Sequence, residues 1–325
     1  MTYAADLAAV RAAADRIAAH AIRTPIHTSQ TMDALSGRAL FFKCESFQRV
    51  GAFKFRGAMN AVAKLDDDTA RRGVVTHSSG NHAQALALAA RIRGIDAHIV
   101  MPTNAPEVKR QAVLGYGGRV IPCEPTLAAR EETADRIVRE TGGTLVPPYD
   151  HPDVIAGQGT IALELFADHP ELDAVIVPVG GGGLISGIAL AYRELAPRVR
   201  VIGAEPLGAD DASRSKAAGA WVPQTAPHTI ADGLRTSLGR LTWPVVRDVV
   251  HRIETPAEDE IVRAMRLVFE RMKLVIEPSA AVGVAVALRQ GGPGEGGLRE
   301  DERRVGVVLC GGNVDLDALP WCRAI

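Results

Sequence analysis

Cysteine is scarce in this 325-residue chain, which has four, at positions 44, 123, 310 and 322. They are far apart and never form a C-x-x-C pair, so the sequence argues against a disulfide framework and against a zinc ribbon. A large net charge is also lacking, because 37 Lys and Arg side chains nearly balance 38 Asp and Glu side chains. The chain has no broad basic footprint for nucleic acid, and we expect no nucleic-acid partner.

Long apolar runs are missing too, since none approaches the roughly 18 residues that a membrane-spanning helix needs. Residues 6–23 are typical of a polar-interrupted helix. They do not show the charged patch and apolar segment of a signal peptide. The hydrophobic fraction of 47% and the charged fraction of 23% are close to the globular average. We therefore expect a folded cytoplasmic protein without a membrane partner.

The spacing of Gly180 to Gly183 does not fit G-x-G-x-x-G, and the chain has no G-x-x-x-x-G-K-[ST], so dinucleotide-binding and P-loop readings are both disfavoured. Lysine is rare as well, with six residues, and Lys54 lies between two phenylalanines in GAFKFRG. Among apolar neighbours an amine loses solvation, its pKa falls, and its neutral form can make a Schiff base. The alternative is a lysine whose stem packs while its charged head reaches water.

One pattern recurs along the chain: a β-branched apolar run, a glycine-bearing turn and an alanine-rich helical stretch. It occurs over residues 73–93 and 174–194, and its first half recurs over 305–312. Further predicted elements are strands over 97–101, 119–122 and 200–203 and a helix over roughly 126–141. Strands that alternate with helices of this length predict βαβ units and a mostly parallel, helix-covered sheet. Right-handed crossovers then favour a doubly wound α/β architecture.

The length of the chain predicts about two domains. A turn-rich PPYDHP stretch at 147–152 breaks the chain after the last predicted helix of a strand-rich segment. We predict a small domain over residues 73–150 and a large domain built from residues 1–72 and 151–325. The glycine-rich stretch at 291–297 is predicted to be a surface loop.

Three strand ends carry residues suited to ligand binding. Four successive glycines, Gly180 to Gly183, allow close approach of a phosphate to the backbone and to a helix N-terminus; the alternative is a tight turn without a ligand. The SSGNH stretch at 78–82 suits a carboxylate or phosphate-like oxygen, or simply caps a helix. Cys310 precedes a further Gly-Gly pair, and its alternative role is that of a small buried apolar residue.

An acidic loop follows another predicted strand. Glu205, Asp210 and Asp211 lie in AEPLGADD. Two carboxylates and a backbone carbonyl suit a hard divalent cation that keeps several waters. The alternative is an ordinary solvated acidic loop.

Together these features match one family. The sequence resembles the fold type II enzymes that depend on pyridoxal 5'-phosphate (PLP), which share the fold of the tryptophan synthase β subunit. Within them it resembles the serine racemase and serine/threonine dehydratase group, and most closely the microbial serine racemases and threo-3-hydroxyaspartate ammonia-lyases. The matching stretches, in family order, are FKCESFQRVGAFKFRGAMNAV (42–62), THSSGNHAQALA (76–87), MPTNAPEVKR (101–110), PPYDHPDVIAGQGT (147–160), VPVGGGGLISG (177–187), GAEPLGADD (203–211), TIADG (229–233) and LCGGNVDL (309–316).

The resemblance implies two doubly wound parallel-sheet domains, of which the large one binds PLP and the small one closes over the substrate. It implies that Lys54 is the Schiff-base lysine and base, that Phe53 lies beside the pyridine ring, and that Ser79 is the acid/base on the opposite face. The resemblance also implies that Asn81 binds the phenolic oxygen of the ring and that Cys310 faces the pyridine nitrogen. The cofactor phosphate would be bound by Gly180, Gly181, Gly182 and Gly183, and the substrate carboxylate by Ser78, Asn81 and His82. A Mg²⁺ or Ca²⁺ ion would be bound by Glu205, the carbonyl of Ala209 and Asp211.

Cys310 departs from the pattern of the group, most of which carry serine at this place. A thiol is a weak hydrogen-bond donor and, unless ionised, no counter-ion for a pyridinium. The cofactor is then a poorer electron sink, which favours early loss of a β-hydroxyl over a long-lived carbanion at Cα. Some animal-type serine dehydratases resemble this chain in having cysteine here, so Cys310 favours elimination.

The resemblance therefore predicts a PLP-dependent ammonia-lyase of amino acid metabolism, a homodimer or homotetramer. It would eliminate water from L-serine, L-threonine or threo-3-hydroxyaspartate, giving a 2-oxo acid and ammonia. Arg130 matches an arginine that can reach a second carboxylate, which would favour hydroxyaspartate; its alternative is a solvated helix face. The competing hypotheses are a serine racemase and, less favoured, a catalytically silent regulatory protein with the same fold.

Overall fold

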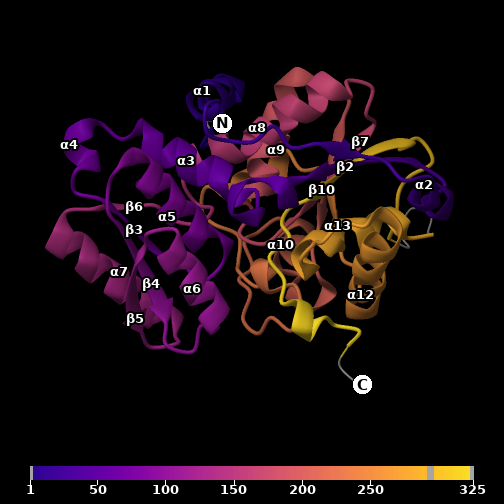
Figure 1. The fold of residues 1–325 in the computed structure, drawn as a ribbon. Coiled ribbons are helices and arrows are strands. Elements are labelled where there is room, and N and C mark those ends of the chain that lie inside the picture. The colour runs from indigo at the N-terminus through magenta and orange to yellow at the C-terminus, as the bar shows by residue number, and fades with distance from the viewer. Residues whose placement is uncertain (1–2, 291–295, 323–325) are drawn as a thin grey trace.

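A computed structural model describes residues 3–290 and 296–322, which form two β-sheets with helices around them (Figure 1). The larger sheet has the strand order β1-β2-β10-β7-β8-β9. Its strands are β1 (Ile26–His27), β2 (Ala39–Cys44), β7 (Ala174–Pro178), β8 (Arg200–Ala204), β9 (Arg252–Glu254) and β10 (Arg304–Leu309). Strand β1 is antiparallel to β2, and the other neighbours are parallel. All residues of β7 are buried, as expected of a parallel strand covered on both faces.

The smaller sheet is parallel throughout, in the order β5-β4-β3-β6. Its strands are β3 (Val74–His77), β4 (Ala97–Pro102), β5 (Arg119–Cys123) and β6 (Thr144–Leu145). Successive side chains point to opposite faces, so Val74 and Ile99 belong to one hydrophobic cluster and Val75 and Val100 to another. Both faces of this sheet are therefore covered.

The helices connect the strands and cover the sheets. The α-helices are α1 (Leu7–Ile17), α2 (Gln30–Ser36), α3 (Lys54–Lys64), α4 (Asp67–Ala70), α5 (Asn81–Arg93), α6 (Glu107–Gly115), α7 (Leu127–Thr141), α8 (Pro152–Asp168), α9 (Gly183–Leu195), α10 (Asp211–Ala218), α11 (Thr242–Asp248), α12 (Glu258–Leu267) and α13 (Pro278–Leu288). Short 3-10 turns are η1 (Glu45–Phe47), η2 (Arg49–Gly51), η3 (Leu207–Ala209), η4 (Asp232–Leu234) and η6 (Leu316–Ala318), and η5 (Val268–Met272) is a π-helical turn.

The predicted α/β elements are confirmed, and apart from the first helix their ends differ by one or two residues. The helix predicted over roughly 126–141 is α7, which begins after Thr126 because the Thr126 side chain accepts a hydrogen bond from the Ala129 N–H. The helix predicted over 6–23 is shorter than expected, since α1 ends at Ile17. Residues 291–295 of the predicted surface loop lie outside the described residues.

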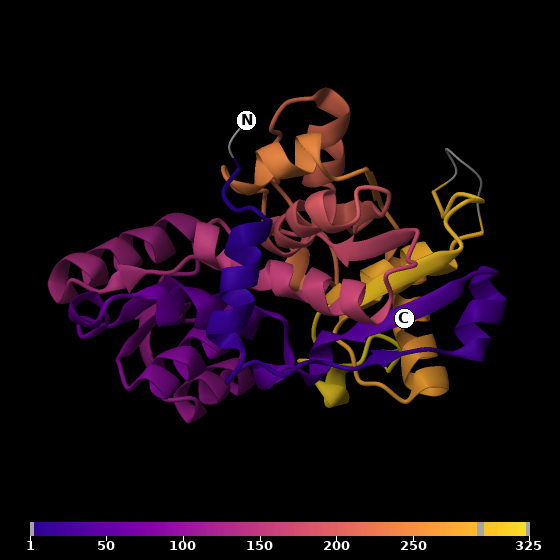
Figure 2. The same ribbon diagram turned by 90° about the horizontal axis from the view of Figure 1, so that it is seen from above.

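Helix α3 lies between the two sheets. Its residues Phe55, Ala58 and Val62 pack in the same cluster as Val74 of the smaller sheet, and the helix also contacts α8. Figure 2 shows α1 lying beside α3 and α8, between the two parts of the molecule. The core of the smaller sheet thus reaches back to α3, while the domain boundaries at 72/73 and 150/151 stay predictions.

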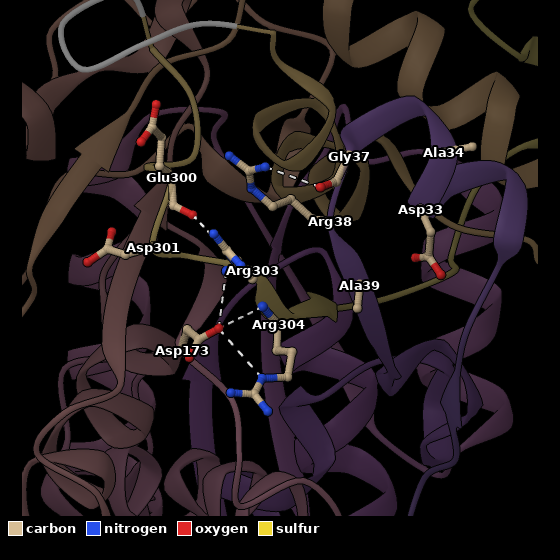
Figure 3. A pocket seen from close by; sticks show the side chains of 10 residues that line it. All are labelled: Asp33, Ala34, Gly37, Arg38, Ala39, Asp173, Glu300, Asp301, Arg303 and Arg304. Atoms are coloured by element: carbon tan, nitrogen blue, oxygen red, sulfur yellow. Dashed lines mark hydrogen bonds and ion pairs between the residues drawn. The ribbon is translucent and has the colours of Figure 1, made fainter.

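The amino ends of the larger sheet carry an open surface hollow, shown in Figure 3. Asp173 in this hollow accepts hydrogen bonds from the backbone N–H groups of Arg303 and Arg304, at 3.1 and 2.8 Å. Asp173 also forms an ion pair with Arg304, and parallel sheets bind ligands at the opposite, carboxyl ends of their strands. No helix within residues 3–290 and 296–322 has the length and apolar character to cross a membrane.

Candidate active site

The carboxyl ends of the parallel strands bring the predicted site residues together. Strand β7 leads into Gly180, β10 leads into Cys310, and β3 of the smaller sheet leads into Ser78. The chain after β2 returns to this edge, where the Phe53 N–H donates to the Cys310 carbonyl at 3.0 Å. Crevices outside the carboxyl ends of strands are where open α/β sheets bind ligands.

Lys54 is the first residue of α3, directly after its N-cap residue Phe53. Its Nζ donates to the Pro148 carbonyl at 2.8 Å and lies 4.9 Å from the centre of the Phe53 ring. Burial lowers the pKa of Lys54 to about 8, against the opposing influence of Cys310 and Glu277. These are the surroundings of a desolvated amine, which can act as a nucleophile and as a base near neutral pH.

Residues Gly180 to Gly183 form the glycine loop, which joins β7 to α9. Gly182 has a φ of 85°, in the left-handed region that suits glycine, and it is the N-cap residue of α9. A Cβ built on Gly181 would lie 2.3 Å from the Tyr149 ring, so this position has room only for glycine. The N–H groups of the four glycines donate no hydrogen bond to any described residue. Unpaired N–H groups ahead of a helix suit a phosphate.

A buried carboxyl group that sequence analysis missed lies beside these residues. Glu277 is 5% exposed, and each of its oxygens accepts a hydrogen bond from Asn81 Nδ2 at 3.0 Å. Burial raises the pKa of Glu277 to about 7, although the Asn81 hydrogen bond opposes the shift. Asn81 Oδ1 in turn accepts from Asn313 Nδ2 at 2.9 Å. The sequence signal that could have identified Glu277 is an acidic residue directly before the apolar stretch that forms α13.

The segment between β3 and α5 presents the two predicted hydroxyls and an imidazole. His82 is 2% exposed, and its Nε2–H donates to the Val146 carbonyl at 2.9 Å. Burial lowers the pKa of His82 to about 3, so the ring is neutral. Its only N–H is thus in use, and a substrate carboxylate would meet the backbone N–H groups at the start of α5 instead. Ser78 and Ser79 are half-buried at the same place.

Cys310 follows β10 and is 2% exposed. Burial, and next the charge of Glu277, raise the pKa of its thiol well above 9. The thiol is therefore protonated at neutral pH and carries no charge toward a ligand beside it.

The predicted cation ligands meet in the loop after β8. Glu205, Ala209 and Asp211 are fully buried, and no described Lys or Arg forms an ion pair with either carboxylate. Burial, and next the charge of Asp211, raise the pKa of Glu205, and burial raises that of Asp211 to about 6. Asp211 Oδ1 has no hydrogen-bond partner among the described residues. A divalent cation would offset these costs, so the residues fit the predicted ion. Within the described parts no group of three or more His, Cys, Asp and Glu side chains is placed to hold a metal ion, so the Ala209 carbonyl and waters would be the other ligands.

Arg130 lies in the first turns of α7 and is half-buried. The pKa of His77, the last residue of β3, is lowered mainly by burial. The charge of Arg130 lowers it further. The Nε of Arg130 is buried without a hydrogen-bond partner, and its guanidinium forms no ion pair with a described residue. The carboxylate-binding role of Arg130 and its alternative, a solvated helix face, both stay predictions.

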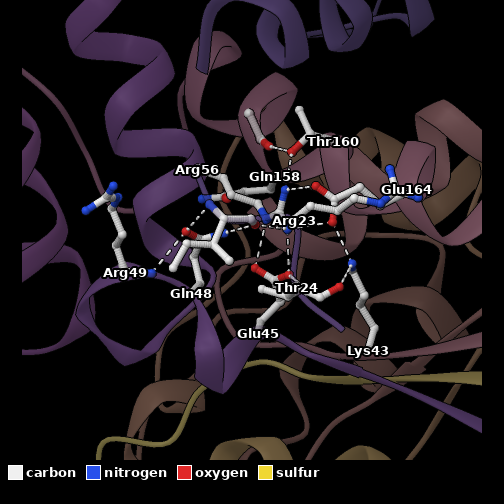
Figure 4. A network of polar contacts seen from close by, with 12 residues as sticks. Arg23, Thr24, Lys43, Glu45, Gln48, Arg49, Arg56, Gln158, Thr160 and Glu164 are labelled. Carbon is white, nitrogen blue, oxygen red and sulfur yellow. Dashed lines mark hydrogen bonds and ion pairs between the residues drawn. The ribbon is translucent and has the colours of Figure 1, made fainter. Parts of the chain in front are cut away.

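A buried polar network anchors the helix that begins with Lys54 (Figure 4). Arg56, two residues further along α3, is 1% exposed and forms paired hydrogen bonds with Glu45 and with Glu164 of α8, at 2.6 to 2.9 Å. Lys43 of β2 contacts the same Glu164 at 2.5 Å and the Thr24 carbonyl at 2.6 Å. Two cations and two anions balance, so these buried charges compensate one another. The network ties α3 to β2 and α8.

Comparisons with known proteins agree with this geometry. A family described as "Pyridoxal-phosphate dependent enzyme" matches residues 17–311. A serine racemase of Arabidopsis thaliana is 53% identical over 317 residues, covering 98% of this chain and 96% of that protein. A beta-hydroxyaspartate dehydratase of Paracoccus denitrificans is 52% identical over 310 residues, covering 95% and 96%. The structure of maize serine racemase superposes with a TM-score of 0.92 at 48% identity, covering 97% and 95%.

The family match covers most of the chain, and the relatives cover nearly all of it. The fold, the Lys54 surroundings and the glycine loop all fit a bound PLP. The chain belongs to the pyridoxal-phosphate dependent enzymes, within the fold type II group of serine racemases and dehydratases.

Proposed function

We propose that the enzyme is an ammonia-lyase that eliminates water from threo-3-hydroxyaspartate, with L-serine and L-threonine as poorer substrates. The observation that carries this proposal is the buried Nε of Arg130, which has no hydrogen-bond partner and belongs to a side chain whose charge acts on His77, the residue before the Ser78–His82 segment. Leaving a buried N–H donor without a partner is costly, and a substrate with a second carboxylate would supply that partner. The similarity to a beta-hydroxyaspartate dehydratase supports the same substrate class.

Bound PLP would supply an electron sink for the electrons released from the substrate Cα. The glycine loop would hold its phosphate, Phe53 and Asn81 would flank its ring, and Cys310 would face its nitrogen. Lys54, with a pKa of about 8, would hold the cofactor and later accept the Cα proton. The neutral Cys310 thiol gives that sink no counter-charge, which supports elimination over racemisation. A Mg²⁺ or Ca²⁺ ion at Glu205 and Asp211 is part of this proposal.

The lowered pKa of Lys54 gives a testable pH dependence. Only the neutral amine attacks the PLP aldehyde, and about 10% of it is neutral at pH 7 with a pKa of about 8, roughly 300-fold more than with an unperturbed pKa. We expect the rate at which the PLP-free enzyme captures PLP to rise about tenfold per pH unit below pH 8 and to level off above it. Stopped-flow absorbance measures this rate. A rate that still rises tenfold between pH 9 and 10 would contradict the environment described for Lys54.

The experiment that tests the proposed function assays the PLP-loaded enzyme separately with L-serine, L-threonine and L-threo-3-hydroxyaspartate. Ammonia, 2-oxo acid and D-isomer are measured for each. We expect hydroxyaspartate to give the largest kcat/KM and oxo acid to exceed D-isomer. Little turnover of hydroxyaspartate would reject the proposed substrate, and D-serine in excess of pyruvate would reject the lyase.

Arg130→Ala should then change substrate preference rather than activity in general. A hydrogen bond to a charged group contributes about 1.5–3 kcal/mol, so kcat/KM for hydroxyaspartate should fall about 10- to 150-fold. Turnover of L-serine, which has no second carboxylate, should change less than about threefold. Arg136→Ala, further along α7 and paired on the surface with Glu140, is the matched control. Equal losses for both substrates in Arg130→Ala would reject a carboxylate-binding role.

The second candidate function is serine racemase. Ser79 is half-buried beside Ser78 and the start of α5, on the segment from the smaller sheet, while Lys54 comes from α3. The relatives named serine racemase favour this reading. Racemisation needs a second acid/base group, so Ser79→Ala should remove D-isomer formation and leave elimination largely intact if both reactions occur.

A further inference from the structure

Residues 148–150, which follow β6 and precede α8, contact the lysine, the glycine loop and a loop near the cation ligands. The Pro148 carbonyl accepts the hydrogen bond from Lys54 Nζ. The Tyr149 ring packs on the glycine loop, where a Cβ on Gly183 would also come within 2.9 Å of Tyr149. Asp150 binds two consecutive backbone N–H groups, with Oδ2 accepting from Arg240 at 2.9 Å and Oδ1 from Leu241 at 2.8 Å.

Arg240 and Leu241, whose N–H groups Asp150 binds, belong to residues 238 to 242, which we call the 238–242 segment. At its start, the Leu238 N–H donates to Asp211 Oδ2 at 3.0 Å, so the segment is bonded to a predicted cation ligand. At its end, the buried Thr242 hydroxyl donates to the Gly181 carbonyl at 2.8 Å and accepts from the Gly239 N–H at 2.8 Å. The segment therefore touches both the cation ligand and the glycine loop.

The Thr242 hydrogen bond orients a peptide group of the glycine loop. A trans peptide points its C=O and the following N–H in opposite directions. Holding the Gly181 carbonyl on the side of the 238–242 segment turns the Gly182 N–H to the other side, away from the segment. That N–H is one of those left without a partner in the described residues, and it is a donor for a phosphate.

We propose that Asp150 is a positioning residue that couples cation binding at Glu205 and Asp211 to phosphate binding by the glycine loop. This inference rests on the cation site proposed above. A cation that fixes Asp211 also fixes Leu238, and the segment transmits that constraint through Thr242 to Gly181. Asp150 clamps the middle of the segment, and Gly239 lies so close to Asp150 that a Cβ there would be 2.2 Å from Oδ1. Without this clamp the segment can adjust locally, and the two sites become independent.

The test measures coupling directly, by calorimetry on the full chain freed of PLP. The probe is pyridoxamine 5'-phosphate, which has the ring and phosphate of PLP but cannot bond covalently to Lys54. Its Kd is measured with and without saturating MgCl₂. Coupled sites typically change each other's affinity about 5- to 150-fold, and the effect is reciprocal. We expect a ratio in that range for the wild type, and a ratio within about twofold of one for Asp150→Ala and Asp150→Asn.

Two further variants make the result specific. Thr242→Val removes the hydroxyl that reaches Gly181 and should also reduce the ratio, which keeps the test valid if Asp150→Ala does not fold. Asp153→Asn is the matched control, because Asp153 is an acid three residues away that pairs with Lys64 on the surface. It should keep the wild-type ratio. If both ligands bind and the Asp150 variants keep that ratio, the inference is overturned while the cation site stands. If the wild type binds no Mg²⁺, the cation site fails as well.

Discussion

Lys54→Ala is expected to abolish turnover of every substrate. A single positioned acid–base group contributes about 10²–10⁴-fold, and Lys54 would also hold the cofactor, so the loss should be at least about 10⁴-fold. Other described lysines have partners of their own, since Lys43 is buried in the Arg56 network and Lys109 pairs with Asp232. Turnover is measured as ammonia release at saturating PLP.

A second measurement separates lost chemistry from lost folding. Borohydride should fix PLP onto the peptide that contains Lys54 in the wild type and leave the variant unlabelled, as mass spectrometry would show. Lys64→Ala is the control, since Lys64 ends the same helix and forms a surface ion pair with Asp153. It should retain both activity and labelling. Turnover by a correctly folded Lys54→Ala enzyme would reject the assignment of Lys54.

The local parts of the site could be predicted from the sequence because their chemistry depends on neighbours in the chain. Four successive glycines after an apolar run have no packing value of their own, and they form the turn between β7 and α9 as expected. Lys54 between two phenylalanines is desolvated, as its neighbours suggested. Strands β3, β4 and β5 of the smaller sheet are apolar runs bounded by turns, which is the pattern that sequence alone detects well, whereas the two-residue β6 was not predicted.

Long-range pairing could not be predicted. Asn81 and Glu277 are 196 positions apart and meet only because α5 and α13 begin at the same place. Tyr149 and Asp150 lie in a stretch whose sequence predicts only a turn, yet they contact the glycine loop and the 238–242 segment. Strand β2 was missed because it contains Lys43, which sequence patterns place in solvent but which is fully buried against Glu164.

Arg56→Met is the prediction with the second largest effect, and it concerns stability. The variant leaves Glu45, which is fully buried, and the mostly buried Glu164 without their bidentate partner (Figure 4). Removing one partner of a buried ion pair typically costs about 3–5 kcal/mol, because the remaining charge is uncompensated. The midpoint of thermal unfolding should fall by several degrees. Calorimetry or circular dichroism measures this shift.

The matched control is Arg71→Met, whose partner Asp68 and own side chain are both largely exposed. Surface pairs contribute about 0–1 kcal/mol, so this variant should unfold within about a degree or two of the wild type. The network also fixes α3, whose first residue is Lys54, so Arg56→Met should bind PLP more weakly at temperatures where it is still folded. If Arg56→Met unfolded at the same temperature as Arg71→Met, the buried network would contribute nothing to stability. Normal PLP affinity in a destabilised Arg56→Met would instead limit the network to a structural role, separate from the placement of Lys54.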